Sequence, residues 1–161
     1  MSLESVREFL RAKAPDITIL ELPASTATVA MAAAGLGVAP AQIAKTLALM
    51  VNGGALLVVT SGDARLHNQK AKAVFGGKAR MMGPEEVETM TGHPPGGVCP
   101  FGLRRPLPVY CDVTLRAFDT VLPAAGSRSS AIRIDPSRMA ELIQAEWVDV
   151  CQANATPSPA A

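Results

Sequence analysis

Two apolar segments separated by a short Asn-Gly-Gly sequence constrain the fold of this chain more than any other feature. The segments are residues 46–51 and 55–60, and Asn52, Gly53 and Gly54 lie between them. Asn-Gly between two β-compatible segments is typical of a β-hairpin, because both residues accept the positive φ angles of a tight turn. Apolar residues follow one another in both segments rather than alternating with polar ones. We therefore expect a central hairpin that is buried on both faces.

The rest of the chain shows helical and extended patterns in irregular order. Apolar spacing and end signals predict helices at residues 2–13, 25–34, 66–75, 84–90 and 136–145, with short helical turns at 40–44 and 113–117. Strands are expected at residues 17–22, 79–82, 108–112, 120–123, 131–134 and 147–150. No GxGxxG or GxxxxGK[ST] phosphate loop is present, and strict strand–helix alternation is missing. The pattern favours one α+β domain around a mixed β-sheet, spanning residues 1–152, with a disordered tail at 153–161.

Composition excludes several classes of protein. The 15 basic and 14 acidic side chains give a net charge of +1, which excludes a protein that coats nucleic acid but not one that binds a single RNA end. The three cysteines are widely spaced, so neither a disulfide framework nor a zinc site is expected, and no metal or cofactor is implied. The polar N-terminus and the lack of an apolar run of about 18 residues predict a cytoplasmic protein with no membrane or DNA partner.

Lys45 is the first residue with a candidate role in chemistry. It leads into the first apolar segment, within Ile43-Ala44-Lys45-Thr46-Leu47. A lysine at the mouth of a buried strand is costly unless its ammonium group reaches water or an anion. The residue pattern leaves two interpretations open: an anion-binding lysine, or one whose stem packs on apolar neighbours while its head stays solvated.

The segment 92–102 is the second candidate, since its four glycines and three prolines exclude regular structure. Such a stiff loop can present bare N–H and C=O groups to a small ligand, and the alternative is a long surface connection. The third candidate is the small-residue turn at 124–130, where Arg128 can pair with a phosphate; the alternative is a polar hairpin turn.

The histidines and cysteines lie in no known nucleophile motif. His67 and His93 are the only histidines, and we expect both at the surface. No GxSxG-like elbow surrounds Cys99, which we interpret as a small side chain of its loop. Cys111 falls in an expected strand and Cys151 directly follows one, and both are predicted to pack in the core.

Several short motifs together resemble a known family. In chain order they are Leu36-Gly37-Val38-Ala39-Pro40, Lys45-Thr46-Leu47, Thr60-Ser61-Gly62-Asp63, Gly96-Gly97-Val98-Cys99-Pro100-Phe101-Gly102 and Ala125-Gly126-Ser127. From about Ile17 to Val150 the chain resembles the YbaK/prolyl-tRNA synthetase-associated domain family of free-standing aminoacyl-tRNA editing deacylases. The resemblance implies a mixed sheet partly curled into a barrel with flanking helices. It also implies metal-independent hydrolysis of the ester in mischarged tRNA, with tRNA(Pro) or a related tRNA as substrate.

The resemblance also implies roles for individual residues. Lys45 of the KTL motif would hold the aminoacylated terminal nucleotide. Substrate contacts would come from Thr46, from the GxxxP loop (Gly96, Gly97, Val98, Cys99, Pro100) and from the small-residue turn (Gly126, Ser127). Where the YbaK branch carries a Gly-Gly-Lys-Arg-Gly type sequence, this chain has Ala125-Gly126-Ser127-Arg128-Ser129-Ser130, so the cysteinyl-specific activity of that branch is not carried over.

Two other functions remain as alternatives. One is a non-catalytic module of the same fold that binds tRNA or a synthetase. The other is a small-molecule esterase, which would need an activated nucleophile that the sequence does not show. The sequence leaves open the amino acid removed, the tRNA, the oligomeric state, and whether a synthetase or elongation factor takes part.

Overall fold

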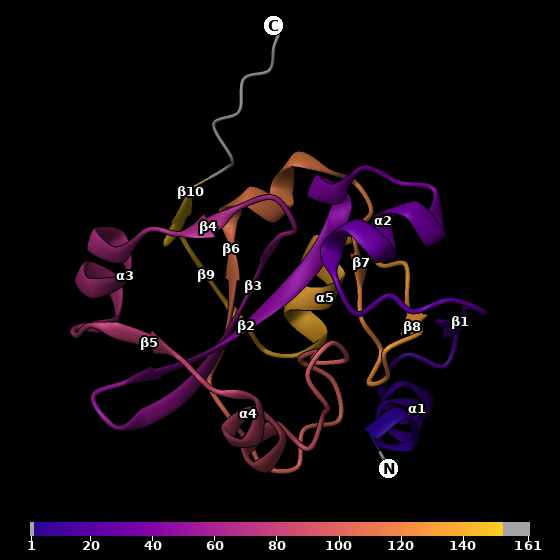
Figure 1. Cartoon of the computed structure of the whole chain (residues 1–161), viewed down its shortest axis with the longest axis horizontal. Coiled ribbons are helices and arrows are strands. Elements are labelled where there is room, and N and C mark those ends of the chain that lie inside the picture. The colour runs from indigo at the N-terminus through magenta and orange to yellow at the C-terminus, as the bar shows by residue number, and fades with distance from the viewer. Residues whose placement is uncertain (1, 153–161) are drawn as a thin grey trace, which may run out of the picture.

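The structure is a computed structural model that describes residues 2–152. The expected hairpin lies at its centre. Strands β2 (Ile43–Val51) and β3 (Gly54–Ser61) pair antiparallel (Figure 1), and the turn residues Asn52 and Gly53 have φ angles of 51° and 80°. The register places Leu49 opposite Leu56. The expectation for residues 153–161 lies outside the described part of the chain.

The main sheet is mixed and has six strands. Its order is β5-β2-β3-β6-β9, where β5 is Ala79–Met81, β6 is Val109–Asp112 and β9 is Glu146–Val148. Strand β7 (Leu122–Pro123) pairs in parallel with the first residues of β2, whereas β5 pairs antiparallel with its last residues. The single-domain α+β fold is confirmed. The sheet does not close into a barrel, and its expected partial curling is not confirmed.

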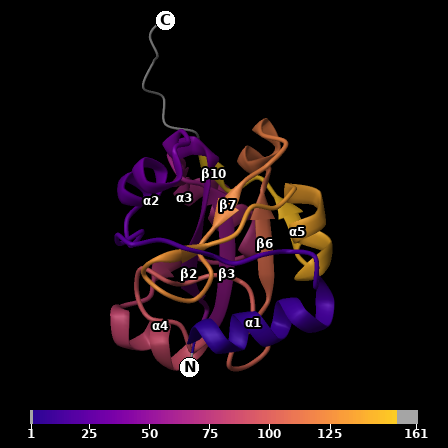
Figure 2. The ribbon, with the colours of Figure 1, turned by 90° about the vertical axis from the view of Figure 1, so that its right-hand side faces the viewer.

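Helices and two short β-ladders surround this sheet. The helices are α1 (Ser2–Lys13), α2 (Val29–Leu36), α3 (Asn68–Phe75), α4 (Pro84–Thr91) and α5 (Pro136–Leu142), with 3-10 turns η1 (Pro40–Gln42) and η2 (Val113–Ala117). The ladders pair β1 (Leu20–Glu21) with β8 (Ser130–Ala131) and β4 (Arg65–Leu66) with β10 (Cys151–Gln152). Figure 2 shows α1 and α5 on the β6 side, away from α2. No described helix is long and apolar enough to cross a membrane.

Both faces of the hairpin are buried, as its unbroken apolar pattern predicts. Leu57 and Val59 point into a cluster that contains Val6 of α1 and Met139 of α5. Val58, between them, points into a second cluster on the opposite face. Side chains alternate between the faces of a strand, so a hairpin with apolar residues at successive positions needs a hydrophobic layer on each side.

Several expected boundaries are wrong, for identifiable local reasons. The helix expected at 25–34 begins at Val29, because the Thr28 side chain accepts a hydrogen bond from the Met31 N–H and caps it. The helical turn expected at 40–44 ends at Gln42, so Lys45 lies inside β2. The helix expected from residue 66 begins at Asn68, where the His67 ring accepts from the Lys70 N–H.

Some expected strands are shorter than predicted because few of their residues find a partner strand. The extended segment 17–22 forms ladder pairs only at β1, and 131–134 contributes only its first residue to β8. Val121 and Ile134 form an isolated antiparallel bridge. The expected strand at 147–150 is β9, and it ends at Val148.

Candidate active site

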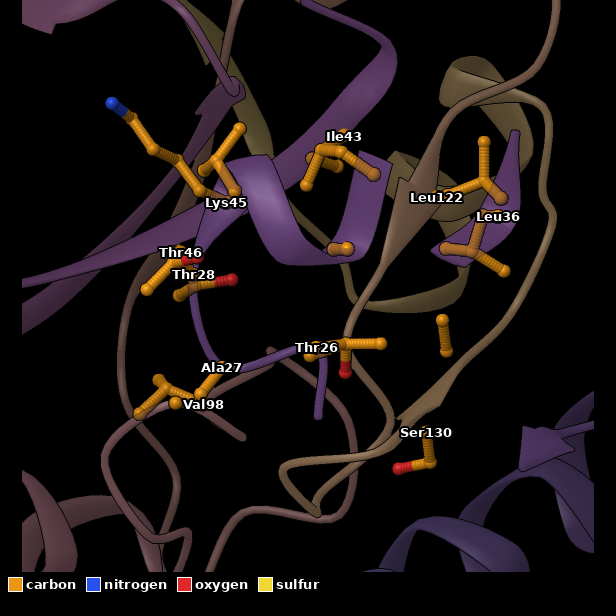
Figure 3. A pocket seen from close by; sticks show the side chains of 16 residues that line it. Thr26, Ala27, Thr28, Leu36, Ile43, Lys45, Thr46, Val98, Leu122 and Ser130 are labelled. Carbon is orange, nitrogen blue, oxygen red and sulfur yellow. The ribbon is translucent and has the colours of Figure 1, made fainter. Parts of the chain in front are cut away.

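A pocket of about 180 Å³ lies where the beginning of β2 meets four other segments. Figure 3 shows the side chains around it. The walls come from α2 and the residues before it, from β2, from the loop 92–102, and from β7 and β8. The lining includes Thr26, Ala27, Thr28, Val29, Leu36, Ile43, Lys45, Thr46, Gly96, Val98, Leu122 and Ser130. Ten of the sixteen lining residues have apolar side chains, so the pocket suits a small organic group with few charges.

Lys45 is the only charged residue in this lining. It is the third residue of β2 and pairs with Thr60 of β3. Partial burial lowers the pKa of its ammonium group below the ordinary value, and the nearby Cys151 and Asp63 partly offset this effect. In Figure 3 the ammonium group extends away from the other labelled side chains. It forms no ion pair with any described residue, so it is a cation at the rim that can accept an anionic ligand.

Thr46 contributes an unusual hydroxyl group to the same pocket. Within residues 2–152, its Oγ1 is the one buried side-chain nitrogen or oxygen that has no hydrogen-bond partner. Leaving a hydroxyl group buried and unpaired costs about 1–3 kcal/mol. Such an atom in a pocket wall is a candidate to bind a polar atom of a ligand.

The loop 92–102 forms one wall, and it contributes less of the lining than expected. Gly96 and Val98 line the pocket, whereas Gly97 and Cys99 are buried behind it and Pro100 is also buried. The N–H groups of Gly96 and Val98 make no hydrogen bond to another described residue, while that of Gly97 donates to the Pro94 carbonyl. Two N–H groups of this wall therefore have no partner among the described residues.

The small-residue turn is divided between two cavities: Ser130 lines the first pocket, whereas Gly126 and Ser127 do not. Gly126 and Ser127 line a second cavity of about 750 Å³, together with Ser2, Arg104 and Arg128. Of the nine expected site residues, the structure brings Lys45, Thr46, Gly96 and Val98 together around the first pocket. The other five support or surround that wall without lining it.

The expectation that His93 lies at the surface is wrong, because its side chain is fully buried. Its Nε2 lies 2.7 Å from the Phe101 carbonyl oxygen and its Nδ1 bonds the Ser2 hydroxyl. Burial lowers the pKa of His93, although the Phe101 contact opposes this shift.

Cys99 Sγ lies 3.6 Å from His93 Nε2, and burial raises the pKa of this thiol to about 12. A thiol that stays protonated is a poor nucleophile, so Cys99 and His93 do not form a catalytic pair. Cys111 and Cys151 are buried, as predicted.

Sequence reasoning missed the segment Thr26-Ala27-Thr28, which lines the pocket just before α2. The Thr26 N–H and hydroxyl both bond the Arg128 carbonyl oxygen, which fixes this segment beside the small-residue turn. Threonines just before an apolar helical segment are a capping signal, which could have placed them ahead of the helix. Among the described residues, no group of three or more His, Cys, Asp or Glu could hold a metal ion.

Comparison with known proteins identifies this arrangement. The sequence model of the aminoacyl-tRNA editing domain matches residues 23–142, a range that includes every lining residue named above. The chain belongs to the aminoacyl-tRNA editing domain family. The uncharacterized protein YwhH of Bacillus subtilis is 45% identical over 154 residues, which are 94% of this editing domain chain and 98% of that protein.

Two further relatives carry functional descriptions of their own. EbsC of Enterococcus faecalis, a proposed Cys-tRNA(Pro)/Cys-tRNA(Cys) deacylase, is 28% identical over 73% of this editing domain chain and 73% of its own length. A crystal structure of a proposed trans-editing enzyme for prolyl tRNA synthetase has a TM-score of 0.87 and 35% identity, covering 94% of this chain and 98% of that one. Both the sequence and the fold therefore place the pocket within an editing domain.

Proposed function

We propose that this editing domain is a trans-acting aminoacyl-tRNA deacylase that removes a small wrong amino acid from a tRNA, with tRNA(Pro) the expected substrate. The observation that carries the proposal is Lys45, an unpaired cation at the rim of an apolar pocket within the matched family region. A pocket of about 180 Å³ suits the aminoacyl group, and the rim suits the charged end of a nucleotide.

The proposed reaction is ester hydrolysis by water. Water adds to the carbonyl carbon of the aminoacyl ester, and the bond from this carbon to the ribose oxygen then breaks. The ribose oxygen takes a proton, and the amino acid leaves as a carboxylate with release of a proton to water. An aminoacyl ester is already activated, so positioning and stabilisation of the developing oxyanion supply most of the acceleration.

Three groups of the pocket fit these tasks. The Lys45 ammonium neutralises the terminal phosphate or the charge that develops in the transition state. The N–H groups of Gly96 and Val98, which have no partner among the described residues, would serve as donors to the substrate carbonyl oxygen. The Thr46 hydroxyl finds its missing partner in a polar atom of the aminoacyl group. We expect no metal to be required, since the ester needs no stronger electrophile.

The described residues favour water over a protein nucleophile. Ser130 Oγ lies 2.7 Å from Ser127 Oγ and has no histidine beside it. Cys99 is buried with a raised pKa, and the ring nitrogens of His93 are both occupied by Ser2 and Phe101. A covalent esterase mechanism lacks its activated nucleophile here.

The test is a deacylation assay with tRNA charged separately with Ala, Ser, Thr, Cys and Pro. We expect the wild-type protein to release one or two of these rapidly and the Lys45→Ala variant to lose most of that activity, at least about tenfold. The matched control is Lys13→Ala, which removes an exposed lysine at the end of α1. Wild-type rates in Lys45→Ala would contradict the mechanism.

The second candidate is a non-catalytic module that binds the acceptor end or a synthetase. An unpaired lysine at a pocket rim suits a binding site as well as a catalytic one. Binding of a non-hydrolysable aminoacyl-adenosine analogue, together with protection of the tRNA esters instead of their release, would favour the module.

A further inference from the structure

We propose that His93 is a positioning residue that fixes the loop wall of the pocket and thereby sets which amino acid side chains are accepted. The inference rests on the proposed function of the pocket. His93 does not line the pocket. It acts through the loop 92–102, which carries Gly96 and Val98.

The imidazole joins both ends of this loop. His93 is the second residue of the loop, and its Nε2 bonds the carbonyl oxygen of Phe101, the second-last residue. The His93 N–H donates to Thr91 Oγ1, whose hydroxyl donates to the Val87 carbonyl of α4. The ring thus closes the loop across eight residues, while the backbone N–H of His93 anchors the start of the loop to the end of α4. Closing a loop through a buried hydrogen bond removes conformations that a free loop would sample.

The same ring also anchors the loop to α1. A carbonyl oxygen can only accept, so the Phe101 contact requires a hydrogen on His93 Nε2. The neutral ring then accepts at Nδ1, and the donor there is the Ser2 hydroxyl at the beginning of α1. Both polar atoms of a fully buried side chain are therefore satisfied in one tautomer. No other side chain of the described loop joins α1 and both loop ends in this way.

Close packing holds the opposite side of the loop. A Cβ atom on Gly96 would lie 2.9 Å from the Ala27 Cβ, and the Arg128 Nε donates to the Pro95 carbonyl at 3.0 Å. The loop is thus clamped between the imidazole on one side and two other pocket-forming segments on the other. Releasing the imidazole frees one side, and the Val98 side chain can then retreat from the pocket. A wall that can retreat no longer excludes larger side chains, because exclusion by size needs a fixed boundary.

The experiment compares substrates that differ by methyl groups. Amide analogues of 3′-aminoacyl-adenosine carrying alanyl, 2-aminobutyryl and valyl groups are titrated against wild type, His93→Ala, His93→Gln and Ser2→Ala. The same amino acids are tested as tRNA esters. A hydrophobic pocket distinguishes one methylene by about 10–200-fold, so we expect His93→Ala to reduce the wild-type preference by about tenfold, mainly through Kd or KM rather than kcat. His93→Gln restores a donor near Phe101 and should recover part of the preference.

The controls separate positioning from general stability. His67→Gln changes the partly buried histidine that caps α3, and it should leave the preference unchanged. If His93→Ala does not fold, Ser2→Ala carries the test, since it removes one ring contact and leaves His93 in place; we expect about a threefold loss of preference. A folded His93→Ala or Ser2→Ala protein with the wild-type ratio of affinities overturns the inference. If the wild-type protein releases no ester but still distinguishes the analogues, the deacylase proposal is overturned and the inference about His93 is not.

Discussion

The backbone of Gly97 lies directly against that of Ser127, so that a Cβ atom on residue 97 would stand 2.9 Å from the Ser127 N and C atoms. This contact joins the loop 92–102 to the small-residue turn, which are far apart in the sequence. Gly97 has no positive φ angle, so the requirement for glycine is one of space alone. Gly97 and Ser127, both expected to contact the substrate, lie outside the lining of the Lys45 pocket and pack against each other.

Gly97→Ala should therefore destabilise the protein and displace the wall. Backbone atoms cannot move aside as a flexible side chain does, and overpacking of this kind costs about 1–3 kcal/mol. Urea denaturation measures the loss. The matched control is Gly54→Ala in β3, where the nearest atom to the new Cβ is the Val51 carbonyl oxygen at an ordinary 3.5 Å. Equal unfolding free energies for the two variants would show that the loop and the turn are not in close contact.

Thr46→Val should raise the stability of the protein and weaken its function. Valine has the shape of threonine without the hydroxyl group, so it removes the buried unpaired Oγ1. We expect the unfolding free energy of the free protein to rise by up to about 1 kcal/mol and deacylation or analogue binding to weaken. Thermal unfolding and the deacylation assay on the same samples measure both effects. A variant that loses stability would indicate that the hydroxyl group is paired in the free protein.

Asp112→Asn tests the buried carboxylate at the end of β6. Asp112 Oδ1 accepts from the N–H groups of Val150 and Cys151, and Oδ2 accepts from that of Thr114. An asparagine amide would direct its NH₂ group at a donor, and each buried donor left without an acceptor costs about 1–3 kcal/mol. Urea denaturation should show this loss. Asp119→Asn, at an exposed position, is the control and should change little.

The stability of the protein should fall in mild acid through His93. Burial lowers its pKa, so the folded protein binds this proton less readily than the unfolded chain. The stability from the neutral ring is complete above about pH 6.5 and is lost as the pH falls through the folded-state pKa, by at most about 1.4 kcal/mol per pH unit. Asp16 and Glu86, which Arg138 and Arg80 hold at a pKa of about 2, titrate at lower pH.

Urea denaturation at about pH 7.5 and about pH 5 checks this prediction. His93→Gln does not titrate in this range and is the control. The wild-type protein should lose more unfolding free energy between the two pH values than the variant does. An identical pH dependence would mean that the imidazole is protonated in the folded protein or is accessible to water.

The central hairpin could be predicted because its signals are local. The Asn52-Gly53 turn and the unbroken apolar pattern on either side specify pairing and burial without reference to distant residues. Lys45 and Thr46 could be placed at a strand mouth for the same reason. The pairing of β4 with β10 could not, because each is only two residues long and carries no strand signal of its own.

The partners of His93 were beyond local reasoning for a different physical reason. Phe101 and Cys99 are close in sequence, but the Ser2 hydroxyl lies 91 positions away, and its approach depends on how α1 packs on the core. Without knowledge of that packing, a lone histidine in a Gly/Pro-rich segment is predicted to be solvated.

The sequence by itself determined the α+β class, the buried hairpin, the family and the Lys45-Thr46 strand that enters the pocket, since turn chemistry, hydrophobic periodicity and motif order are all local or additive. Only the tertiary structure decided which expected residues line the pocket. Gly96 and Val98 face it, while Gly97, Cys99, Gly126 and Ser127 build the support behind it. That division depends on long-range close packing, where displacements of a few tenths of an ångström decide which atom reaches the cavity.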